Sequence, residues 1–377
     1  MNARACLIGL PLLAACAAAP APEGAASTST APNGPPCPLF LGEPADHLIE
    51  PGEEHFAHLW MLTTDGENAE AYWSSDGTQL VFQRRAEHAG IECDRIFLLP
   101  GHEPMRQVSN GRGATTCAYF MPGDRSVVYA STHGWLDACP PPIDPREFAS
   151  GYFWRVFPEF DLWVQELGSD LPRRLTETWG YDAEATVSPR GDRLVFTSSR
   201  SGDLELWTCD LDGGNLVQVT DTPGYDGGAF FSHDGTKLVF RSQAFTPGQE
   251  AAELAESREL LARWRVRPSL MEIQVSAVDG TQRRTLGPLG GANFAPFFFP
   301  DDRRVIFASN HHDPGTPKRE FDLFAIGLDG QGLERITHFV GFDSFPMFSP
   351  DGRYLVFASN RGQRKPGETN LFLAEWR

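Results

Sequence analysis

The sequence predicts an all-β fold, a six-bladed β-propeller made of four-stranded antiparallel blades. Two observations carry this expectation: a short turn recurs six times, and it does so within a repeating unit of about 44 residues, a period typical of blades. Each turn combines residues such as Ser, Pro, Asp and Gly and separates two short apolar strands. The turns lie at residues 74–77, 121–124, 188–191, 232–235, 299–302 and 349–352.

The repeating unit is clearest between residues 181 and 220, where four short apolar segments follow one another. A turn with two glycines joins the last two of them, because Gly readily adopts the positive φ that tight hairpins need. Four antiparallel strands joined by tight turns are typical of one propeller blade. The four predicted strands are 185–188, 193–198, 205–211 and 216–220.

The two ends of the chain predict how the ring closes. The last unit, residues 346–376, supplies only three strands. Residues 58–63 run directly into the first inner strand, just as the fourth strand of one blade runs into the next blade. We therefore expect this N-terminal strand to complete the last blade.

Two stretches resemble the repeats of TolB-type propellers. They are Phe-Ser-Pro-Asp-Gly-Arg-Tyr-Leu-Val-Phe-Ala-Ser-Asn-Arg at residues 348–361 and Gly-Asp-Leu-Glu-Leu-Trp-Thr-Cys-Asp-Leu-Asp-Gly-Gly-Asn at residues 202–215. The resemblance extends over residues 56–377 and implies a TolB-like propeller. TolB carries an α/β domain ahead of its propeller, whereas here we expect only a tether in that place.

The N-terminus predicts export and a lipid anchor. Arg4 precedes an apolar run at residues 5–15, which is too short to span a bilayer as a helix. The tetrad Leu13-Ala14-Ala15-Cys16 resembles the bacterial lipobox, in which the Cys is acylated; ordinary cleavage near Ala18 is the alternative. This predicts a bacterial lipoprotein, held to a membrane through Cys16 and facing the periplasm or the exterior.

Three regions follow from these observations. Residues 1–15 form the signal peptide, residues 16–55 a flexible tether and lead-in, and residues 56–377 the propeller. The tether contains mainly Ala, Pro, Ser and Thr up to about residue 36, a composition that buries too little apolar surface to fold.

The net charge of −18 excludes whole classes of partner. Binding to nucleic acid requires a basic surface, and an anionic lipid surface attracts basic segments. We therefore expect a monomer that binds another protein or a peptide of the cell envelope.

The cysteines beyond Cys16 predict at least one disulfide, because an exported protein meets an oxidising environment. Cys93, Cys117 and Cys139 all fall on one face of the predicted propeller, so a disulfide among them is expected, with the pairing left open. Cys37 is a further candidate, and Cys209 lies inside a predicted strand as a buried thiol.

Large insertions all fall between the second and third strands of a blade, and hence on one face of the ring. They lie at residues 131–159, 243–270 and 311–320. Residues 250–264 predict an amphipathic helix across this face, either as a structural cap or as a partner-binding element. Because long loops on a rigid scaffold often carry function, we look for the site on this loop-rich face.

Two aligned series of residues enter the inner strands at the mouth of the central channel. The first is polar in every blade and either ties down each loop or binds a ligand. It consists of Asn68, Thr115, Asp182, Asp226, Asn293 and Asp343. The second, two residues further on, varies between blades, and its acidic members predict a pocket for a cation, an amine or a basic peptide tail. It consists of Glu70, Cys117, Glu184, Gly228, Ala295 and Phe345.

The sequence contains no common catalytic motif such as Gly-x-Ser-x-Gly or His-Glu-x-x-His, and we assign no catalytic residue and no cofactor. His133 in the first insertion joins the candidate binding residues. A metal held by His133 with His311 or His312 is a weaker alternative, because the spacing follows no known ligand pattern.

These observations predict a non-catalytic, lipid-anchored propeller of the bacterial cell envelope. It would bind a protein or peptide through its loop-rich face and an acidic channel mouth. The alternative is a metal-assisted lyase or hydrolase that acts on polysaccharide or peptide in the channel mouth.

Overall fold

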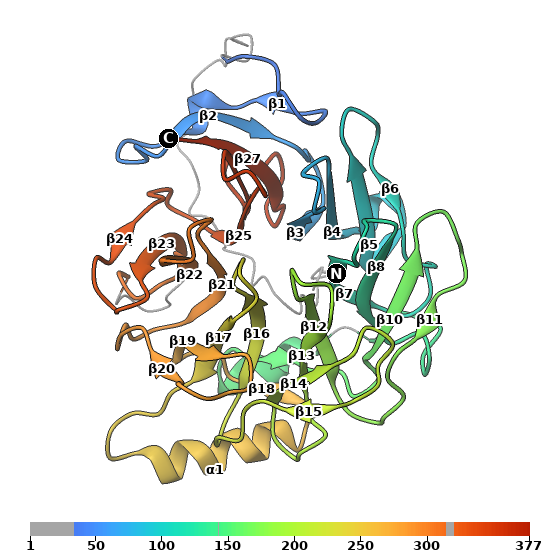
Figure 1. Ribbon diagram of the computed structural model, residues 1–377, viewed down its shortest axis with the longest axis vertical. Helices are drawn as coiled ribbons and strands as arrows, with labels where there is room; N and C mark the ends of the chain where they lie inside the picture. Colours follow the sequence, from blue (N-terminus) through green and yellow to red (C-terminus); the bar gives the residue numbers. More distant parts are fainter. Residues whose placement is uncertain (1–33, 142, 314–319) are drawn as a thin grey trace, which may run out of the picture.

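A computed structural model describes residues 34–141, 143–313 and 320–377 (Figure 1). The predicted signal peptide, Cys16 and residues 17–33 of the predicted tether lie outside the described residues. Within them, no helix has the length and hydropathy needed to cross a bilayer.

The described residues form a ring of six antiparallel blades, as the repeat predicts (Figure 1). In each blade the strands follow the chain order from the channel outward. Blade 1 contains β3 (Glu67–Trp73), β4 (Gln79–Ala86), β5 (Ile91–Pro100) and β6 (Arg106–Gln107). Blade 2 contains β7 (Thr115–Phe120), β8 (Ser126–Ser131), β10 (Asp161–Glu166) and β11 (Arg173–Arg174). Blade 3 contains β12 (Asp182–Val187), β13 (Leu194–Ser198), β14 (Glu205–Cys209) and β15 (Val217–Gln218).

The second half of the ring repeats this arrangement. Blade 4 contains β16 (Asp226–Phe231), β17 (Lys237–Gln243), β19 (Met271–Ala277) and β20 (Arg284–Thr285). Blade 5 contains β21 (Asn293–Phe298), β22 (Arg304–Ser309), β23 (Asp322–Gly327) and β24 (Glu334–Arg335). Blade 6 contains β25 (Asp343–Phe348), β26 (Tyr354–Ser359) and β27 (Asn370–Trp376), with two N-terminal strands beyond them, β2 (Phe56–Met61) and β1 (Glu43–Pro44).

The ring closes as the sequence predicts. Strand β2 pairs antiparallel with β27, with Phe56 opposite Trp376 and Met61 opposite Phe372. This pairing satisfies the backbone groups at the outer edge of β27, and the chain then continues directly into blade 1.

The packed body begins earlier than residue 56, the boundary expected from the sequence. Phe40 is buried, β1 adds a fifth strand to blade 6, and the short 3₁₀ helix η1 (Asp46–Leu48) follows. Glu53 accepts two hydrogen bonds from Arg361, each 3.0 Å long, and Arg361 also donates to Asp343 over 2.6 Å. These three side chains have no exposed surface, so residues 34–55 are fixed to blade 6 by a buried charge network.

The core lies between neighbouring blades. An aromatic residue stands at the same place in the second strand of each blade, where its ring is fully buried. These residues are Phe82, Tyr129, Phe196, Phe240, Phe307 and Phe357. The Leu-Val-Phe pattern after each turn is therefore the packing surface between blades.

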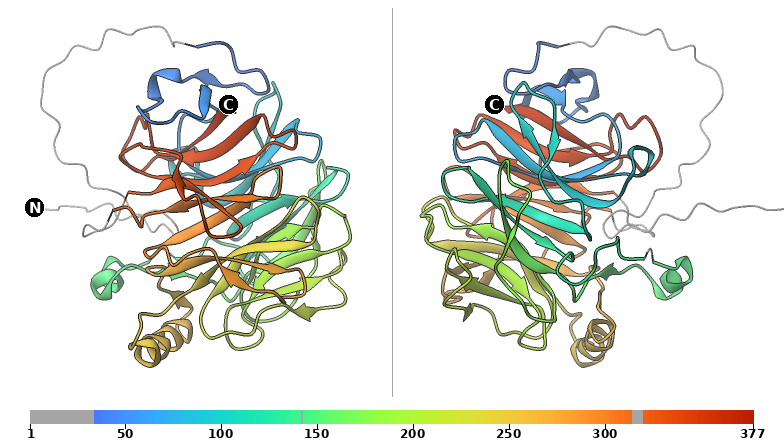
Figure 2. Two further views of the ribbon diagram at one scale, coloured as in Figure 1. Left: turned by 60° about the vertical axis from the view of Figure 1, so that its left-hand side comes forward. Right: turned by 90° about the vertical axis from the view of Figure 1, so that its right-hand side faces the viewer.

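The recurrent turns gather on the face opposite the insertions. Asp124 accepts hydrogen bonds from the backbone and side chain of Ser75 in the preceding blade, and Asp302 contacts His233 in the same way. The insertions protrude from the other side, where the 3₁₀ helix η3 (Pro145–Ser150) and the helix α1 (Glu250–Leu261) both stand out (Figure 2).

The helix α1 confirms a helix in the second insertion, but not its expected position across the face. It lies along the outer rim of the ring, and none of its residues is buried (Figure 1). The prediction that it is amphipathic is wrong: the apolar residues of Glu250–Leu261 do not gather on one face, so the helix has no apolar stripe with which to cover the ring.

Deleting residues 2–64 removes both N-terminal strands and should abolish formation of a monomeric propeller, because the edge of β27 is then unpaired. Thermal unfolding and size-exclusion chromatography of a variant with a replacement export signal check this. Deletion of residues 2–33 behind the same signal is the control and should leave the unfolding temperature unchanged. A stable, cooperative monomer lacking residues 2–64 would refute closure by β2.

Candidate functional site

An arch formed by two insertions covers one side of the channel mouth. Strand β9 (Trp154–Arg155), from the insertion of blade 2, pairs antiparallel with β18 (Arg265–Val266), from the insertion of blade 4. An ion pair between Arg265 and Glu147 joins the same two insertions. Trp154 reaches across to Phe294 of blade 5, with ring centroids 6.1 Å apart. The arch therefore spans blade 3 and covers the channel mouth on that side.

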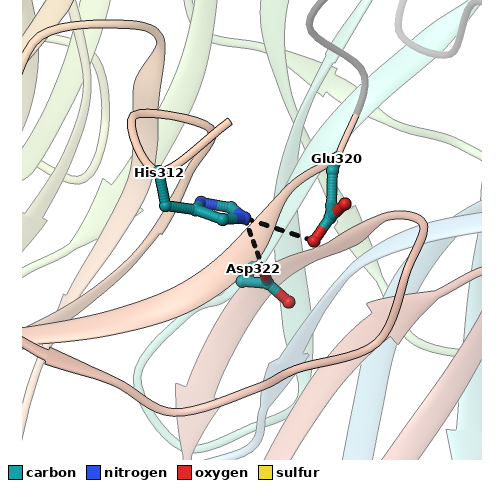
Figure 3. A group of neighbouring side chains, drawn as sticks. All are labelled: His312, Glu320 and Asp322. Carbon is teal, nitrogen blue, oxygen red and sulfur yellow. Dashed lines mark hydrogen bonds and ion pairs between the residues drawn. The ribbon is translucent and has the colours of Figure 1, made fainter. Parts of the chain in front are cut away.

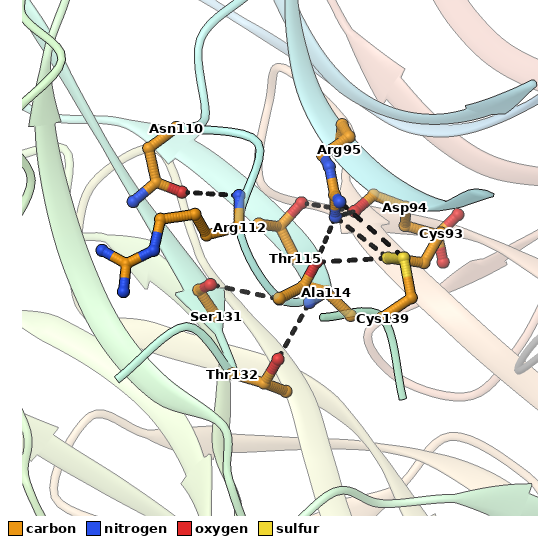
Figure 4. Close-up of a disulfide and its surroundings, with 11 residues drawn as sticks. Cys93, Asp94, Arg95, Asn110, Arg112, Ala114, Thr115, Ser131, Thr132 and Cys139 are labelled. Carbon is orange, nitrogen blue, oxygen red and sulfur yellow. Dashed lines mark hydrogen bonds between the residues drawn. A yellow bond between two sulfur atoms is a disulfide. The ribbon is translucent and has the colours of Figure 1, made fainter. Parts of the chain in front are cut away.

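A disulfide between Cys93 and Cys139 holds the other end of this insertion to blade 1 (Figure 4). The expected disulfide among the three cysteines is thus present, and Cys117 is the free member. Beside the disulfide, Thr115 donates a hydrogen bond of 3.0 Å to the backbone carbonyl of Asp94, which ties blade 2 to blade 1 (Figure 4). Cys37 and Cys209 are buried thiols, as predicted for Cys209.

A cavity of about 620 Å³ lies beneath the arch at the channel mouth. Its lining includes both disulfide cysteines, the arch residues 154–157 and side chains from the inner strands of several blades. Five residues of the two predicted series line it: Glu70, Thr115, Cys117, Glu184 and Phe345. His133 does not.

A bulge in every inner strand turns the second series toward the channel. In each blade the pairing of the first two strands shifts register at this point, and the residue there has a positive φ. The φ values are 53° for Glu70, 51° for Cys117, 60° for Glu184, 61° for Gly228, 50° for Ala295 and 55° for Phe345. Five of the six are not glycine, so each bears the strain of a left-handed backbone.

Aromatic rings fill the channel below the cavity. Tyr72 of blade 1 meets Phe230 of the opposite blade 4, with ring centroids 5.4 Å apart. Tyr119 and Phe297 also contact Phe230, at 6.2 Å and 5.4 Å. The cavity therefore has an aromatic floor.

Glu184 is fully engaged by neighbouring groups of the protein. It forms an ion pair with Arg241, accepts hydrogen bonds of 2.8 and 2.9 Å from the Tyr225 hydroxyl, and accepts one of 2.6 Å from Thr197. The Gly228 amide donates a further bond of 3.0 Å. Glu184 is thus neutralised internally by Arg241. A role for Glu184 in binding a cation stays a prediction.

Glu70 is the unusual member of the cavity. Glu70 is only 5% exposed. No Lys, Arg or His among the described residues forms an ion pair with its carboxylate. Burial raises the pKa of Glu70 to about 7. The Cys117 thiol lowers this pKa by donating a hydrogen bond, nearby Glu184 raises it, and the charge of Arg241, which forms no ion pair with Glu70, lowers it. Burial also raises the pKa of Cys117 well above its ordinary value, so its thiol stays protonated.

The remaining members of the first series lie outside the cavity, where they tie loops and blades together. Asp182 accepts a bond from Arg200, Asp226 is held by Arg283, and Asp343 belongs to the network of Arg361. Asn68 donates to the carbonyl of Thr369 in blade 6, and Asn293 donates to that of Met271 in blade 4. These contacts are the loop ties that the sequence left as one of two interpretations; a binding role for the series stays a prediction.

The histidines do not come together as a metal site would require. His133 of blade 2 contacts Ser131 through Nδ1 over 2.7 Å and packs on Trp163. His311 of blade 5 makes the equivalent contact with Ser309 and packs on Phe324. The weaker alternative, a metal held by His133 with His311 or His312, has no such group of ligands among the described residues, because His133 belongs to blade 2 and the other two to blade 5.

His312 lies beside Glu320 and Asp322, a set of side chains of the kind that bind metals (Figure 3). Its Nε2 is 3.3 Å from Glu320 and 2.8 Å from Asp322. Arg335 donates to both carboxylates, so a cation already occupies their shared side. This charge network fits a role in holding the loop better than metal binding.

Sequence reasoning missed Arg241, Tyr225 and the arch. One signal for Arg241 is present in the chain: the two consecutive glycines of β16, Gly227 and Gly228, stand opposite it. A Cβ at Gly228 would collide with the guanidinium of Arg241. Where the other blades have a side chain, blade 4 has Gly228, and the Arg241 side chain from the neighbouring strand fills the space that this glycine leaves.

Changing Glu70 to Gln should stabilise the protein at pH 8 and have little effect at pH 5. The folded-state pKa of about 7 lies above the ordinary 4.5, so ionisation is less favourable in the folded chain, and stability falls as pH rises through 7. The expected gain at pH 8 is on the order of 1–3 kcal/mol. Urea unfolding at both pH values measures it, with Glu92→Gln at the exposed rim as control; equal effects of the two variants would contradict the assignment.

The chain is similar to several solved structures, at low sequence identity. No protein-family profile and no curated protein sequence matches the chain. Among solved structures, TolB from Acinetobacter baumannii is 16% identical over 84% of this chain and 67% of its own, with a TM-score of 0.49. An oligogalacturonate lyase in complex with manganese is 13% identical over 89% and 96%, with a TM-score of 0.50. Hydrazine synthase from Kuenenia stuttgartiensis is 14% identical over 71% and 39%, with a TM-score of 0.50.

These proteins differ in role, and at such identities the likeness extends to the fold alone. The chain is a six-bladed β-propeller, and its fold is similar to that of the oligogalacturonate lyase.

Proposed function

We propose that this protein is a non-catalytic, lipid-anchored propeller of the bacterial cell envelope, which binds a protein or peptide through its loop-rich face and the cavity at the channel mouth. The observation that carries the proposal is the roofed cavity with a buried carboxylate, Glu70, that lacks a cationic partner among the described residues. Cavities of about 300–1,000 Å³ are typical of ligand sites, and this one suits a side chain or a peptide end.

The chemistry of the cavity favours binding over nucleophilic catalysis. Cys117 is the thiol that lines it, and burial raises the pKa of this thiol well above its ordinary value. A nucleophilic cysteine requires the opposite shift, since the thiolate is the reactive form. Arg241 and Glu184 neutralise each other, so they form a fixed wall of the site.

The envelope location is supported by two features. The disulfide between Cys93 and Cys139 is a bond that persists in oxidising compartments. The tetrad ending at Cys16 resembles a lipobox, and the TolB-like repeats are similar to those of an envelope protein. A tether between Cys16 and the body would let the loop-rich face reach partners near the membrane.

A photo-crosslinking residue at Pro141, on the exposed rim of the cavity, should capture a discrete partner in cells that make the full chain. The same residue at Pro189, an exposed proline of a turn on the opposite face, is the matched control and should not capture it. The crosslinked products are identified by mass spectrometry. Equal capture from both positions, or none from Pro141, would contradict binding at this face.

Changing Cys16 to Ser should move the protein from the membrane fraction to the soluble fraction of lysed cells, because acylation requires the thiol. Fractionation with immunoblotting measures this, and incorporation of a labelled fatty acid should disappear with the same change. Cys209→Ser, which removes a buried thiol of the body, is the control and should remain in the membrane fraction. Membrane partition that persists in Cys16→Ser would refute the anchor.

A further inference from the structure

We propose that the cavity binds a primary ammonium group carried on an apolar side chain or ring, with Glu70 as its counter-ion. A lysine side chain or an amino terminus of a peptide partner has this chemistry. The inference rests on the proposed function and specifies the chemistry of the ligand's buried end.

The charges at the base of the cavity leave one negative charge without an internal partner. Glu70, Glu184 and Arg241 line this base, so two carboxylates face one guanidinium there. Arg85 and Arg155 line the cavity as well, where Arg85 pairs with Glu67 and Arg155 lies over the ring of Phe157. The ion pair joins Arg241 to Glu184, so Glu70 has the weak thiol donor of Cys117 and an attraction to Arg241 without an ion pair. A buried carboxylate without a cation is unfavourable, and a bound cation would relieve this cost.

The repeat itself shows what a partner for Glu70 would look like. Glu184 and Glu70 occupy the same position in blades 3 and 1, and both have a positive φ. Glu184 is held by Tyr225 and Arg241 of the next blade. The strand register places Ala114 and Ala130 of blade 2 at the positions that correspond to Tyr225 and Arg241.

Two alanines thus replace the hydroxyl and guanidinium donors that serve Glu184. Ala114 lines the cavity, so part of the space left by the missing side chains is open to a ligand. A ligand ammonium beside Glu70 would take the role that the Arg241 guanidinium plays beside Glu184. A neutral or anionic group there would leave the charge of Glu70 uncompensated.

The wall beside Glu70 favours an apolar body on the ligand. Phe345 of blade 6 is the neighbour of Glu70 around the channel. The ring of Phe294 contacts the ring of Phe345, with centroids 5.8 Å apart. Arg241 already covers the rings of Trp154 and Tyr225, at 5.3 and 4.8 Å. Because those two faces are occupied, the ligand's charge belongs at Glu70 and its apolar part against Phe294 and Phe345.

The test uses the full chain in detergent micelles and three probes of similar shape: 2-phenylethylammonium, 2-phenylethanol and 3-phenylpropanoate. Calorimetric titration or ligand-observed NMR should show saturable binding of the ammonium at pH 8, with the alcohol and the carboxylate at least tenfold weaker. Glu70→Gln should reduce ammonium affinity at least tenfold. Glu92→Gln removes the same charge from the exposed rim and should change affinity less than threefold.

Cooperative thermal unfolding of Glu70→Gln confirms that any loss of affinity is local. Ammonium binding no tighter than alcohol binding, or full affinity in Glu70→Gln, would overturn the inference. If the ammonium probe fails but the crosslinker at Pro141 still captures a partner, the proposed function stands and only the inference about the ammonium group fails. The two failures are therefore distinguishable. Loss of affinity in both Gln variants alike would also overturn it, because the effect would then be one of overall charge.

Discussion

The pairing of β2 with β27 is the constraint on which the rest of the molecule depends. A six-bladed ring stays closed only while its first and last blades are held side by side, and β2 does this by pairing with the outer edge of β27. The backbone amide of Asn68 donates to Thr369 across this seam over 2.9 Å, and the buried network of Arg361 reinforces the blade on its outer side. Glu70 and Phe345 come from the two blades that meet here. The proposed site therefore exists only in the closed ring.

A second constraint, the bulge in each inner strand, decides which side chains meet at the mouth. The same left-handed backbone recurs in all six blades, so the chemistry of each sector depends on the residue placed there. Blades 1 to 3 present Glu70, Cys117 and Glu184, and blades 4 to 6 present small or aromatic residues. One half of the mouth is therefore polar and the other apolar, which suits an amphipathic ligand group.

Much of this arrangement could be predicted from the sequence because a repeat aligns residues without any structure. The alignment placed the strands, the closure and the loop-rich face, and it brought Glu70, Cys117 and Glu184 together. It also selected the first series as candidates, of which Thr115 lines the cavity and the other five are buried ties outside it. An alignment compares equivalent positions within blades, but it does not show which neighbours in the adjacent blade each residue contacts.

The features that the sequence did not predict are all contacts between distant segments. The pair of Glu184 and Arg241 joins blades 3 and 4, and the arch joins two insertions through only two paired residues on each side. Such short strands have no periodicity of their own to reveal them. Likewise, the composition of residues 16–55 predicts a tether and lead-in, whereas Glu53 has its partner Arg361 more than 300 residues away.

The contrast between Glu70 and Glu184 shows how a repeat protein can acquire a binding site without changing its backbone. At Glu184 the next blade supplies an internal cation, and the glycine at 228 leaves the room that Arg241 needs. At Glu70 the corresponding residues are alanines, and the carboxylate keeps the desolvation cost that Arg241 relieves at Glu184. The folded protein tolerates this cost because the ring and its disulfide-bound arch hold the site in place. The buried charge of Glu70 in a rigid cavity is then a source of affinity for a cation that enters it. Binding of the cation offsets the desolvation cost that the carboxylate carries in the folded protein.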